Sequence, residues 1–257
     1  MYPELLKIGD LTIRSYGLLT LIAAVAGYLY ASHEAKKELG IPAQKIRDLT
    51  VWLILASFLG GKLFFYLEDA DHYFSSFENL KSNFRAGFVF YGSLLFAVPM
   101  AAWFFLRNRW PFWPMIDILA VTTCIVHGIG RIGCFLNGCC HGHATQMPWA
   151  LIYKDPACQA PLNTPLHPTQ LYEFTLIFMI LALLLYLRPR RRFNGQLIFV
   201  YVILYALGRS LIELFRGDEA RGYIIDGSLS HSQFISSLVI ICAIGLYIVK
   251  RRKRGSH

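Results

Sequence analysis

Long runs of apolar residues separated by short polar segments dominate this chain. Each run is about 17–22 residues long, the length that an α-helix needs to cross the roughly 30 Å hydrocarbon core of a bilayer. The pattern predicts an all-α integral membrane protein with seven transmembrane helices. They are expected near residues 16–32, 48–67, 87–106, 115–136, 168–187, 195–214 and 231–249. The connecting segments are too short for a separate soluble domain, so residues 1–257 are expected to form a single polytopic membrane domain.

The composition agrees with a membrane protein. Hydrophobic residues make up 55% of the 257 residues and charged residues only 16%, and the mean hydropathy is +0.44. The amino-terminal segment lacks the basic start of a signal peptide, and no small-residue cleavage site follows the first apolar run. The first run is therefore expected to stay in the protein as a transmembrane helix.

Lysine and arginine are distributed unequally between the two sets of connecting segments. One set, which includes residues 36–47, 107–109, 188–192 and 250–254, carries 15 basic residues, and the other set carries 7. Cytoplasmic segments are enriched in these residues, so we expect the N-terminus outside and the C-terminus in the cytoplasm. The net charge of +9 follows from this topology signal and from affinity for anionic lipid heads, so no nucleic-acid partner is expected.

Three basic residues lie inside apolar runs, at Lys62, Arg131 and Arg209. Charge in hydrocarbon is costly, so intramembrane basic residues are functional candidates that need partners. A count of about 1.5 Å per residue places several polar groups at a similar depth, just beneath the outer face. This predicted layer comprises Tyr16, Lys62, Tyr91, Arg131, Glu173, Arg209 and Glu213.

The charges in this layer favour an anionic ligand. Arg209 and Glu213 are four residues apart and share one helix face, so one alternative is a pair that only stabilises the bundle. That alternative does not account for the further basic residues Lys62, Arg131 and Arg216. Arginine forks suit phosphate, and the abundant phosphate of the outer leaflet belongs to phospholipid head groups. We therefore expect a phospholipid head group to bind here.

The segment His127–His143, HGIGRIGCFLNGCCHGH, is the most informative part of the chain. Its glycines allow another backbone or a ligand to approach Arg131 closely. His127 lies one helical turn before Arg131, so it either packs in the bundle with a hydrogen-bonded neighbour or serves as a base. A second segment, residues 165–173, carries Gln170, Tyr172 and Glu173 into the membrane. An ordinary interfacial helix start is the alternative for this second segment.

Together these residues resemble the prolipoprotein diacylglyceryl transferase family of bacterial inner membranes, over nearly the whole chain. The motifs that carry the resemblance are Tyr16-Gly17, Gly60-Gly61-Lys62, Phe90-Tyr91-Gly92, Gly130-Arg131-Ile132-Gly133 with Phe135, Asn137, Gly138 and Gly142, the string His167-Pro168-Thr169-Gln170-Leu171-Tyr172-Glu173, and Tyr205, Arg209, Glu213 and Arg216. The resemblance implies seven transmembrane helices around a lipid cavity that opens sideways to the bilayer. It also implies transfer of the diacylglyceryl group of phosphatidylglycerol to the lipobox cysteine thiol of a preprolipoprotein, which forms a thioether and releases glycerol phosphate, with no metal and no organic cofactor.

Within this reaction the nucleophile is the acceptor's cysteine. We expect Arg131 and Arg209 to bind the phosphate and stabilise the leaving group, and Glu213 to orient Arg209. Tyr91, Tyr205 and Glu173 are candidates for proton handling or head-group binding. The remaining expected substrate-binding residues are Tyr16, Lys62, Asn137, Gly142, His167, Gln170, Tyr172 and Arg216.

This chain departs from the family pattern at several of these positions. Tyr91 stands where many members have a histidine often proposed as the base, and Lys62 stands where arginine is common. Cys134 and Cys139 occupy positions that are often asparagine and glutamate, and His143 replaces a frequent arginine. These differences leave open which group acts as the base, and whether the acceptor is a different one.

The six cysteines allow several interpretations. Cys124 and Cys242 lie in apolar runs and are expected to be buried small apolar residues. A disulfide from Cys158 to Cys139 or Cys140 is one possibility outside the membrane, where such bonds persist. The sequence Cys-Cys-His-x-His also has zinc-ligand residue types, although without the usual C-x2-C spacing. A redox role towards a quinone is the third possibility, although there is no C-x-x-C motif.

Two rival functions stay open at the level of sequence. A paralogue could move a lipid group to a different acceptor. A non-enzymatic binder or transporter of anionic lipids could use the same arginine layer. A transporter predicts polar residues through to the cytoplasmic face and internal repeats, and neither is evident in the sequence.

Overall fold

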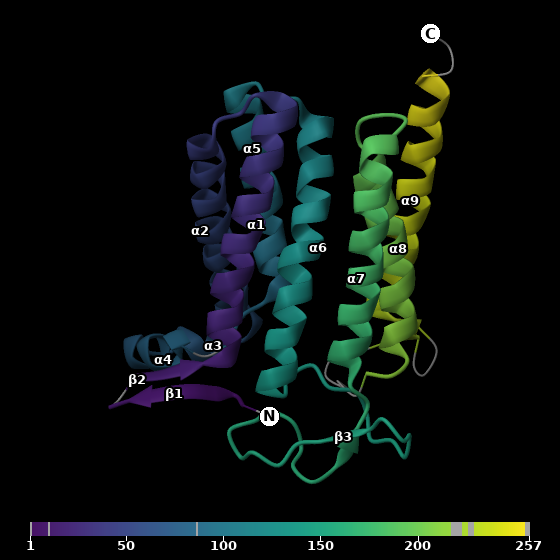
Figure 1. Cartoon of the computed structure of the whole chain (residues 1–257). Helices are drawn as coiled ribbons and strands as arrows, with labels where there is room; N and C mark the ends of the chain where they lie inside the picture. Colours follow the sequence, from purple (N-terminus) through teal and green to yellow (C-terminus); the bar gives the residue numbers. More distant parts are fainter. Residues whose placement is uncertain (1, 10, 86, 217–222, 226–228, 255–257) are drawn as a thin grey trace. The chain divides into compact units, whose positions relative to one another are not determined.

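The computed structural model describes residues 2–9, 11–85, 87–216, 223–225 and 229–254 (Figure 1). Long helices form most of it. They are α1 (Ser15–Leu39), α2 (Ala43–Glu68), α5 (Phe90–Asn108), α6 (Phe112–Asn137), α7 (Thr169–Leu187), α8 (Gln196–Glu213) and α9 (His231–Arg254). Short helical segments lie between them, namely α3 (Ala70–Tyr73), α4 (Phe77–Ser82), η1 (Asn83–Arg85) and η2 (Arg188–Arg190).

Six of the described helices are long and apolar enough to cross a membrane: α1, α2, α5, α6, α7 extended through η2, and α8. Their outer surfaces are apolar, as Leu21, Phe178 and Leu211 are each about 60% exposed, which suits contact with lipid tails. The chain is therefore a mostly helical, multi-pass membrane protein. The seventh predicted span coincides with α9, whose apolar part, Ile240–Lys250, is shorter.

Three small antiparallel sheets are found among the described residues, and the sequence pattern did not predict them. They pair β1 (Glu4–Ile8) with β2 (Leu11–Arg14), β3 (Leu151–Ile152) with β4 (Pro165–Leu166), and β5 (Tyr223–Ile225) with β6 (Leu229–Ser230). The β1–β2 hairpin precedes α1 directly, and Ser15 at the start of α1 donates its backbone N–H to Pro3 O at 3.0 Å. The hairpin therefore sets the start of the first long helix.

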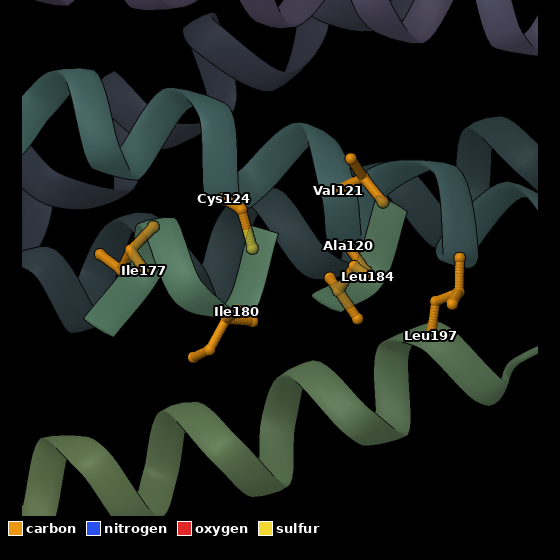
Figure 2. Packing of buried hydrophobic residues seen from close by; sticks show 7 residues of the cluster. All are labelled: Ala120, Val121, Cys124, Ile177, Ile180, Leu184 and Leu197. Carbon is orange, nitrogen blue, oxygen red and sulfur yellow. The ribbon is translucent and has the colours of Figure 1, made fainter. Parts of the chain in front are cut away.

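The chain divides into two compact units, residues 1–30 with 116–257 and residues 31–115. In the larger unit, α6, α7 and α8 share a hydrophobic core, shown in Figure 2. It consists of Ala120, Val121 and Cys124 from α6, Ile177, Ile180 and Leu184 from α7, and Leu197 from α8. Because these side chains interdigitate, the core fixes how α6 and α7 align along their length.

A buried aspartate also ties α6 to α8 in the larger unit. Asp117 is fully buried, and its carboxylate accepts the backbone N–H of Gly195 at 2.7 Å and that of Ile198 at 3.1 Å. Gly195 precedes α8 with a φ of +96°, a conformation that favours glycine. The first backbone N–H groups of a helix have no partner within the helix, so Asp117 acts as a cap supplied by a neighbouring helix.

In the smaller unit, α2 packs closely on α5. Gly60 and Gly92 face each other across this contact, and a Cβ on either residue would collide with the other's carbonyl oxygen. Small residues allow helix backbones in membranes to approach closely. Lys62 lies two residues beyond Gly60 on α2. Its Nζ donates to Gly87 O at 3.0 Å and lies 5.1 Å from the centre of the Phe65 ring.

Candidate functional site

Three helices of the larger unit meet at Glu173. Glu173 lies in α7 and is 1% exposed, and its Oε1 accepts Nη2–H of Arg131 at 2.8 Å and the hydroxyl of Tyr205 at 2.9 Å. His127 Nε2 lies 3.3 Å from the same oxygen. Arg131 and His127 come from α6 and Tyr205 comes from α8. A single buried carboxylate oxygen therefore joins α6, α7 and α8.

The local sequence explains why each group reaches this point. His127 and Arg131 are one turn apart on α6, and Arg131 Nε donates to His127 Nε2 at 3.2 Å. Pro168 directly precedes Thr169, the first residue of α7, and a proline is well tolerated at a helix start. Glu173 is the fifth residue of the helix and therefore lies in its second turn. We predicted that His127 would pack in the bundle with a hydrogen-bonded neighbour, and the structure has this arrangement.

The predicted pair on α8 is also present. Arg209 and Glu213 are four residues apart, and Arg209 Nη1 lies 2.5 Å from Glu213 Oε2, with both side chains largely buried. Tyr205, Arg209 and Glu213 follow one another at intervals of four residues and so share one face of α8. The hydroxyl of Tyr205 links that face to Glu173.

Arg131 and Arg209 are thus each held by a carboxylate, but Arg131 still has N–H groups to donate. Its contacts with the described residues employ three N–H groups: Nε to His127, Nη2 to Glu173, and Nη1 to the sulfur of Cys134 at 3.9 Å. A guanidinium has five N–H groups, so Arg131 can still donate to the oxygens of an anion. Glu173 and His127 fix the orientation from which it would do so.

The end of α6 is a tight turn that places two cysteines beside a third. Gly138 has a φ of +75°, its N–H donates to Phe135 O at 3.3 Å, and the N–H of Cys139 donates to Cys134 O at 3.1 Å. This pattern is the Schellman motif, which returns the chain towards the last turn of the helix. Cys140 follows with a φ of +60°, which is uncommon for a residue other than glycine. The turn therefore brings Cys139 and Cys140 back to Cys134.

The sulfur atoms of Cys134, Cys139 and Cys140 all lie within 4.8 Å of one another. Hydrogen bonds from the Cys134 and Cys139 thiols lower the pKa of the Cys140 thiol, and the positive charges of Arg131 and Arg216 act in the same direction. All six cysteines are free thiols in the structure, so the bridge from Cys158 to Cys139 or Cys140, one of the possibilities left open by the sequence, is not formed.

The first residues of α7 hold this cysteine turn in place. Thr169 Oγ1 donates to Cys140 O at 2.7 Å, and Gln170 Nε2 donates to Cys139 O at 2.7 Å and to the hydroxyl of Tyr153 at 3.1 Å. Burial raises the pKa of Tyr153 to about 12, so its hydroxyl stays neutral. We expected Gln170 to bind substrate, but its fully buried side chain contacts the cysteine turn.

His167 and Tyr172 form a separate polar group beside the start of α7. His167 Nδ1 lies 3.0 Å from the Tyr172 hydroxyl, which also accepts Nε1–H of Trp149 at 2.7 Å. Burial and the neighbouring His143 lower the pKa of His167, so the ring is neutral at pH 7. Gly142 donates its N–H to His167 O at 2.9 Å. A side chain at Gly142 would collide with the carbonyl oxygen of Phe215, which explains why glycine occupies this position.

The other candidates in the larger unit lie near these groups. A Cβ at Gly133 on α6 would lie 3.2 Å from the Tyr16 ring, so Tyr16 packs on α6 two residues beyond Arg131. Asn137 is buried at the last position of α6 and accepts the N–H of Gln159 at 3.2 Å through its backbone oxygen. Arg216 forms a backbone bridge with Gly142 and donates its N–H to Glu213 O at 3.1 Å.

Lys62 and Tyr91 belong to the smaller unit and are described only within it. Lys62 on α2 is buried, and its Nζ lies near the rings of Phe65 and Phe84. Tyr91 is in the first turn of α5, is 59% exposed, and has its ring 5.9 Å from that of Phe90. The predicted common layer of polar groups therefore stays a prediction.

The structure corrects one assignment and adds one residue. Cys124 is buried as predicted, but Cys242 is exposed on α9. Helix α9 turns this residue outward, where a small, weakly polar side chain is compatible with lipid. The sequence interpretation missed Asp117, although a single acid at the start of an apolar run was a visible signal.

Comparison with known proteins identifies the family of this chain. The family model described as prolipoprotein diacylglyceryl transferase matches residues 3–249. A phosphatidylglycerol–prolipoprotein diacylglyceryl transferase of Clostridium tetani is 32% identical over 99% of this chain and 100% of its own length. A protein of the same name from Pseudomonas putida is 32% identical over 95% of this chain and 92% of its own length. The chain therefore belongs to the prolipoprotein diacylglyceryl transferase family.

Proposed function

We propose that this protein transfers the diacylglyceryl group of phosphatidylglycerol to the cysteine thiol in the lipobox of a preprolipoprotein. A thioether forms and glycerol phosphate is released, which makes this the first step of lipoprotein maturation. Membership of the family supports the reaction. The observation that carries the assignment of the site is the buried Glu173, which orients Arg131 while leaving N–H groups of the guanidinium available.

The chemistry of the reaction explains the need for oriented arginines. The bond from the diacylglyceryl carbon to the phosphate oxygen breaks, and negative charge increases on the departing phosphate. Arg131 and Arg209 would donate hydrogen bonds to these oxygens, since arginine forks match phosphate geometry. Donors that are already oriented stabilise such charge without reorganisation during the reaction. Glu173 holds Arg131, and Glu213 holds Arg209 in the same manner.

The remaining candidates are assigned to substrate binding and proton handling. The hydroxyl of Tyr205 donates to Glu173 and would stabilise the negative charge of this carboxylate beside Arg131. Tyr91 is also proposed to act in catalysis. The proposed head-group and acceptor contacts are Tyr16, Lys62, Asn137, Gly142, His167, Gln170, Tyr172, Glu173 and Arg216. For Gln170 and Gly142 this role would be indirect: Gln170 holds the carbonyl oxygen of Cys139, and Gly142 leaves room for Phe215 O.

The proposed setting is the bacterial inner membrane. The distribution of lysine and arginine supports an external N-terminus and a cytoplasmic C-terminus. That orientation requires seven spans, with α9 as the seventh. It places Arg131, near the end of α6, close to the periplasmic leaflet, where phosphatidylglycerol and a translocated lipobox peptide would both arrive. Membrane lipids are the other expected partners.

A bacterium depleted of its own diacylglyceryl transferase provides the test. The wild-type chain should restore growth and the mobility shift of a prolipoprotein, whereas Arg131→Ala should insert into the membrane but restore neither. Labelled phosphatidylglycerol and a lipobox peptide then measure transfer by purified protein. An abundant, inserted wild-type protein that transfers no diacylglyceryl group to the cysteine peptide would contradict the proposal.

A further inference from the structure

The cluster of Cys134, Cys139 and Cys140 has the dimensions of a metal site. Their sulfur atoms lie within 4.8 Å of one another. Zinc–sulfur bonds of about 2.3 Å place the sulfurs of a tetrahedral site roughly 3.8 Å apart. Movements of less than about 1 Å would therefore bring the three sulfurs onto one ion. Side-chain rotation can supply such movements without a change in the backbone.

The backbone around the cluster is fixed from two directions. The Schellman turn at Gly138 directs Cys139 back to α6. The side chains of Thr169 and Gln170 on α7 bind the carbonyl oxygens of Cys140 and Cys139, both at 2.7 Å. Because a preformed set of ligands loses little freedom on binding, this arrangement favours a metal over three independent thiols. The hydrogen bond from Thr169 to the carbonyl oxygen of Cys140 also helps to hold Cys140 at its positive φ.

Positive charge compensates for the thiolates that a metal requires. Three thiolates on a divalent ion leave one net negative charge. Arg131 Nη1 lies 3.9 Å from the sulfur of Cys134, so that charge would lie beside a guanidinium. Soft thiolate ligands select zinc or monovalent copper among the common ions. Of these, zinc prefers four ligands, and the cluster found among the described residues contains three.

A zinc ion with three protein ligands has an open fourth position, as catalytic zinc sites do. Cys134 is buried, whereas Cys139 and Cys140 are only partly buried, so the cluster has an accessible side. The reaction needs a thiolate, and Glu173 is poorly suited to generate one. Its Oε1 is already engaged by Arg131 and Tyr205. A thiol that binds a zinc ion is deprotonated outright, which would supply the missing activation.

We propose that Cys134, Cys139 and Cys140, two of which depart from the family pattern, bind a zinc ion whose fourth ligand is the thiol of the acceptor's lipobox cysteine, in contrast to the metal-free reaction that the family resemblance implies. This inference rests on the proposed function for its substrate. On binding, the acceptor thiol releases its proton to solvent. The sulfur electron pair then forms a bond to the carbon of the diacylglyceryl group that carries the phosphate. The bond from that carbon to the phosphate oxygen breaks. The oxygen keeps its electron pair and leaves as glycerol phosphate beside Arg131, so no oxidant or reductant is needed.

Metal content of the purified full chain tests the site without any activity measurement. Protein loaded with zinc and then desalted should retain about one ion per chain. Cys139→Ser and Cys140→Ser should each weaken binding at least about tenfold against a chromophoric chelator, since each removes a ligand. Cys158→Ser and Cys242→Ser are the matched controls and should bind zinc normally. Equal affinities in all four variants, or no retained zinc in the wild type, would overturn the site.

Cobalt tests the fourth ligand and guards against variants that do not fold. The wild-type protein with Co²⁺ in place of zinc should show thiolate-to-cobalt charge-transfer absorption of an intensity expected for three thiolates. A lipobox peptide should increase this absorption, whereas the same peptide with serine in place of cysteine should not. An identical response to both peptides would overturn the role of the acceptor thiol.

Transfer activity separates this inference from the proposed function. Chelator treatment should abolish transfer to the cysteine peptide, and added zinc should restore it. Full transfer by protein shown to be free of metal would overturn the zinc proposal and leave the proposed function intact. A different result would overturn the proposed function and leave the metal site intact. In that case the cobalt-substituted protein would bind the cysteine peptide through its metal, but the zinc-loaded protein would form no thioether.

Discussion

The ion pair between Arg131 and Glu173 offers the sharpest test of the site, because it can be removed from one side or from both. Arg131→Ala leaves Glu173, which is 1% exposed, without its cationic partner. Breaking a buried pair from one side costs about 3–5 kcal/mol, because a charge remains buried without compensation. Arg131→Ala alone therefore lowers stability and activity together and does not distinguish a structural role from a catalytic one.

The double variant Arg131→Ala with Glu173→Gln makes that distinction. The glutamine is neutral and can still accept the hydroxyl of Tyr205, now 2.9 Å from Oε1. The penalty of the uncompensated charge disappears, so most of the lost ~3–5 kcal/mol should be recovered in thermal unfolding. Activity should not recover, because the donor to the phosphate is still missing. Loss of one such donor to developing charge costs about 10²–10³ in rate.

The assay measures transfer from labelled phosphatidylglycerol to a lipobox peptide by protein in nanodiscs, normalised to folded protein. Arg190→Ala is the matched control, since it also removes an arginine but from η2, beyond the far end of α7, where Arg190 stacks 4.2 Å above the Tyr186 ring. Its transfer rate should equal that of the wild type. If the double variant were as active as the wild type, Arg131 would be only the structural partner of Glu173, and its phosphate-binding role would be refuted.

Three further predictions concern other parts of the larger unit. Arg209→Lys keeps the charge but loses the fork, so transfer should fall at least about tenfold, and a near-normal rate would indicate a simple point charge. Asp117→Ala should lower unfolding stability by about 1–3 kcal/mol, because two backbone N–H groups at the start of α8 lose their acceptor; the rate per folded molecule should be unchanged. Gly142→Ala should reduce the yield of folded protein on size-exclusion chromatography, since its Cβ would collide with Phe215 O, whereas Gly245→Ala, which meets open space, should not.

The sequence predicted the features that depend on periodicity within one helix. Helix α6 was expected at 115–136 and is found at Phe112–Asn137, because length and hydropathy alone define a membrane helix. The pairing of Arg209 with Glu213 followed from the four-residue interval. Glu173 was named as a candidate from its depth in an apolar run, and in the structure it is buried and contacts Arg131 and Tyr205. These inferences needed no knowledge of how helices pack.

Features that depend on contacts between distant segments were not predictable in this way. Glu173 is 42 residues from Arg131 in sequence, and nothing in the spacing assigned them to each other. The convergence of Cys134 with Cys139 and Cys140 depends on the turn at Gly138 and on an unusual φ at Cys140. Their expected location outside the membrane suggested instead that Cys139 or Cys140 could pair with Cys158. The three small sheets were missed because strands of two to five residues carry too little pattern.

The position of Arg131 thus depends on how α6 is aligned with α7, and the core beneath the site sets that alignment. Ile177 is one turn beyond Glu173 on α7, and it belongs to the cluster that contains Cys124 of α6. A Cβ at Gly128, three residues before Arg131, would lie 3.6 Å from Cγ2 of Ile177, which is ordinary contact. The two helices therefore lie in close contact one turn from the ion pair. Because packed cores do not deform continuously, a displacement here would move the guanidinium relative to both Glu173 and the sulfur of Cys134. The same helix contact thereby positions the proposed phosphate donor and the proposed metal ligands together.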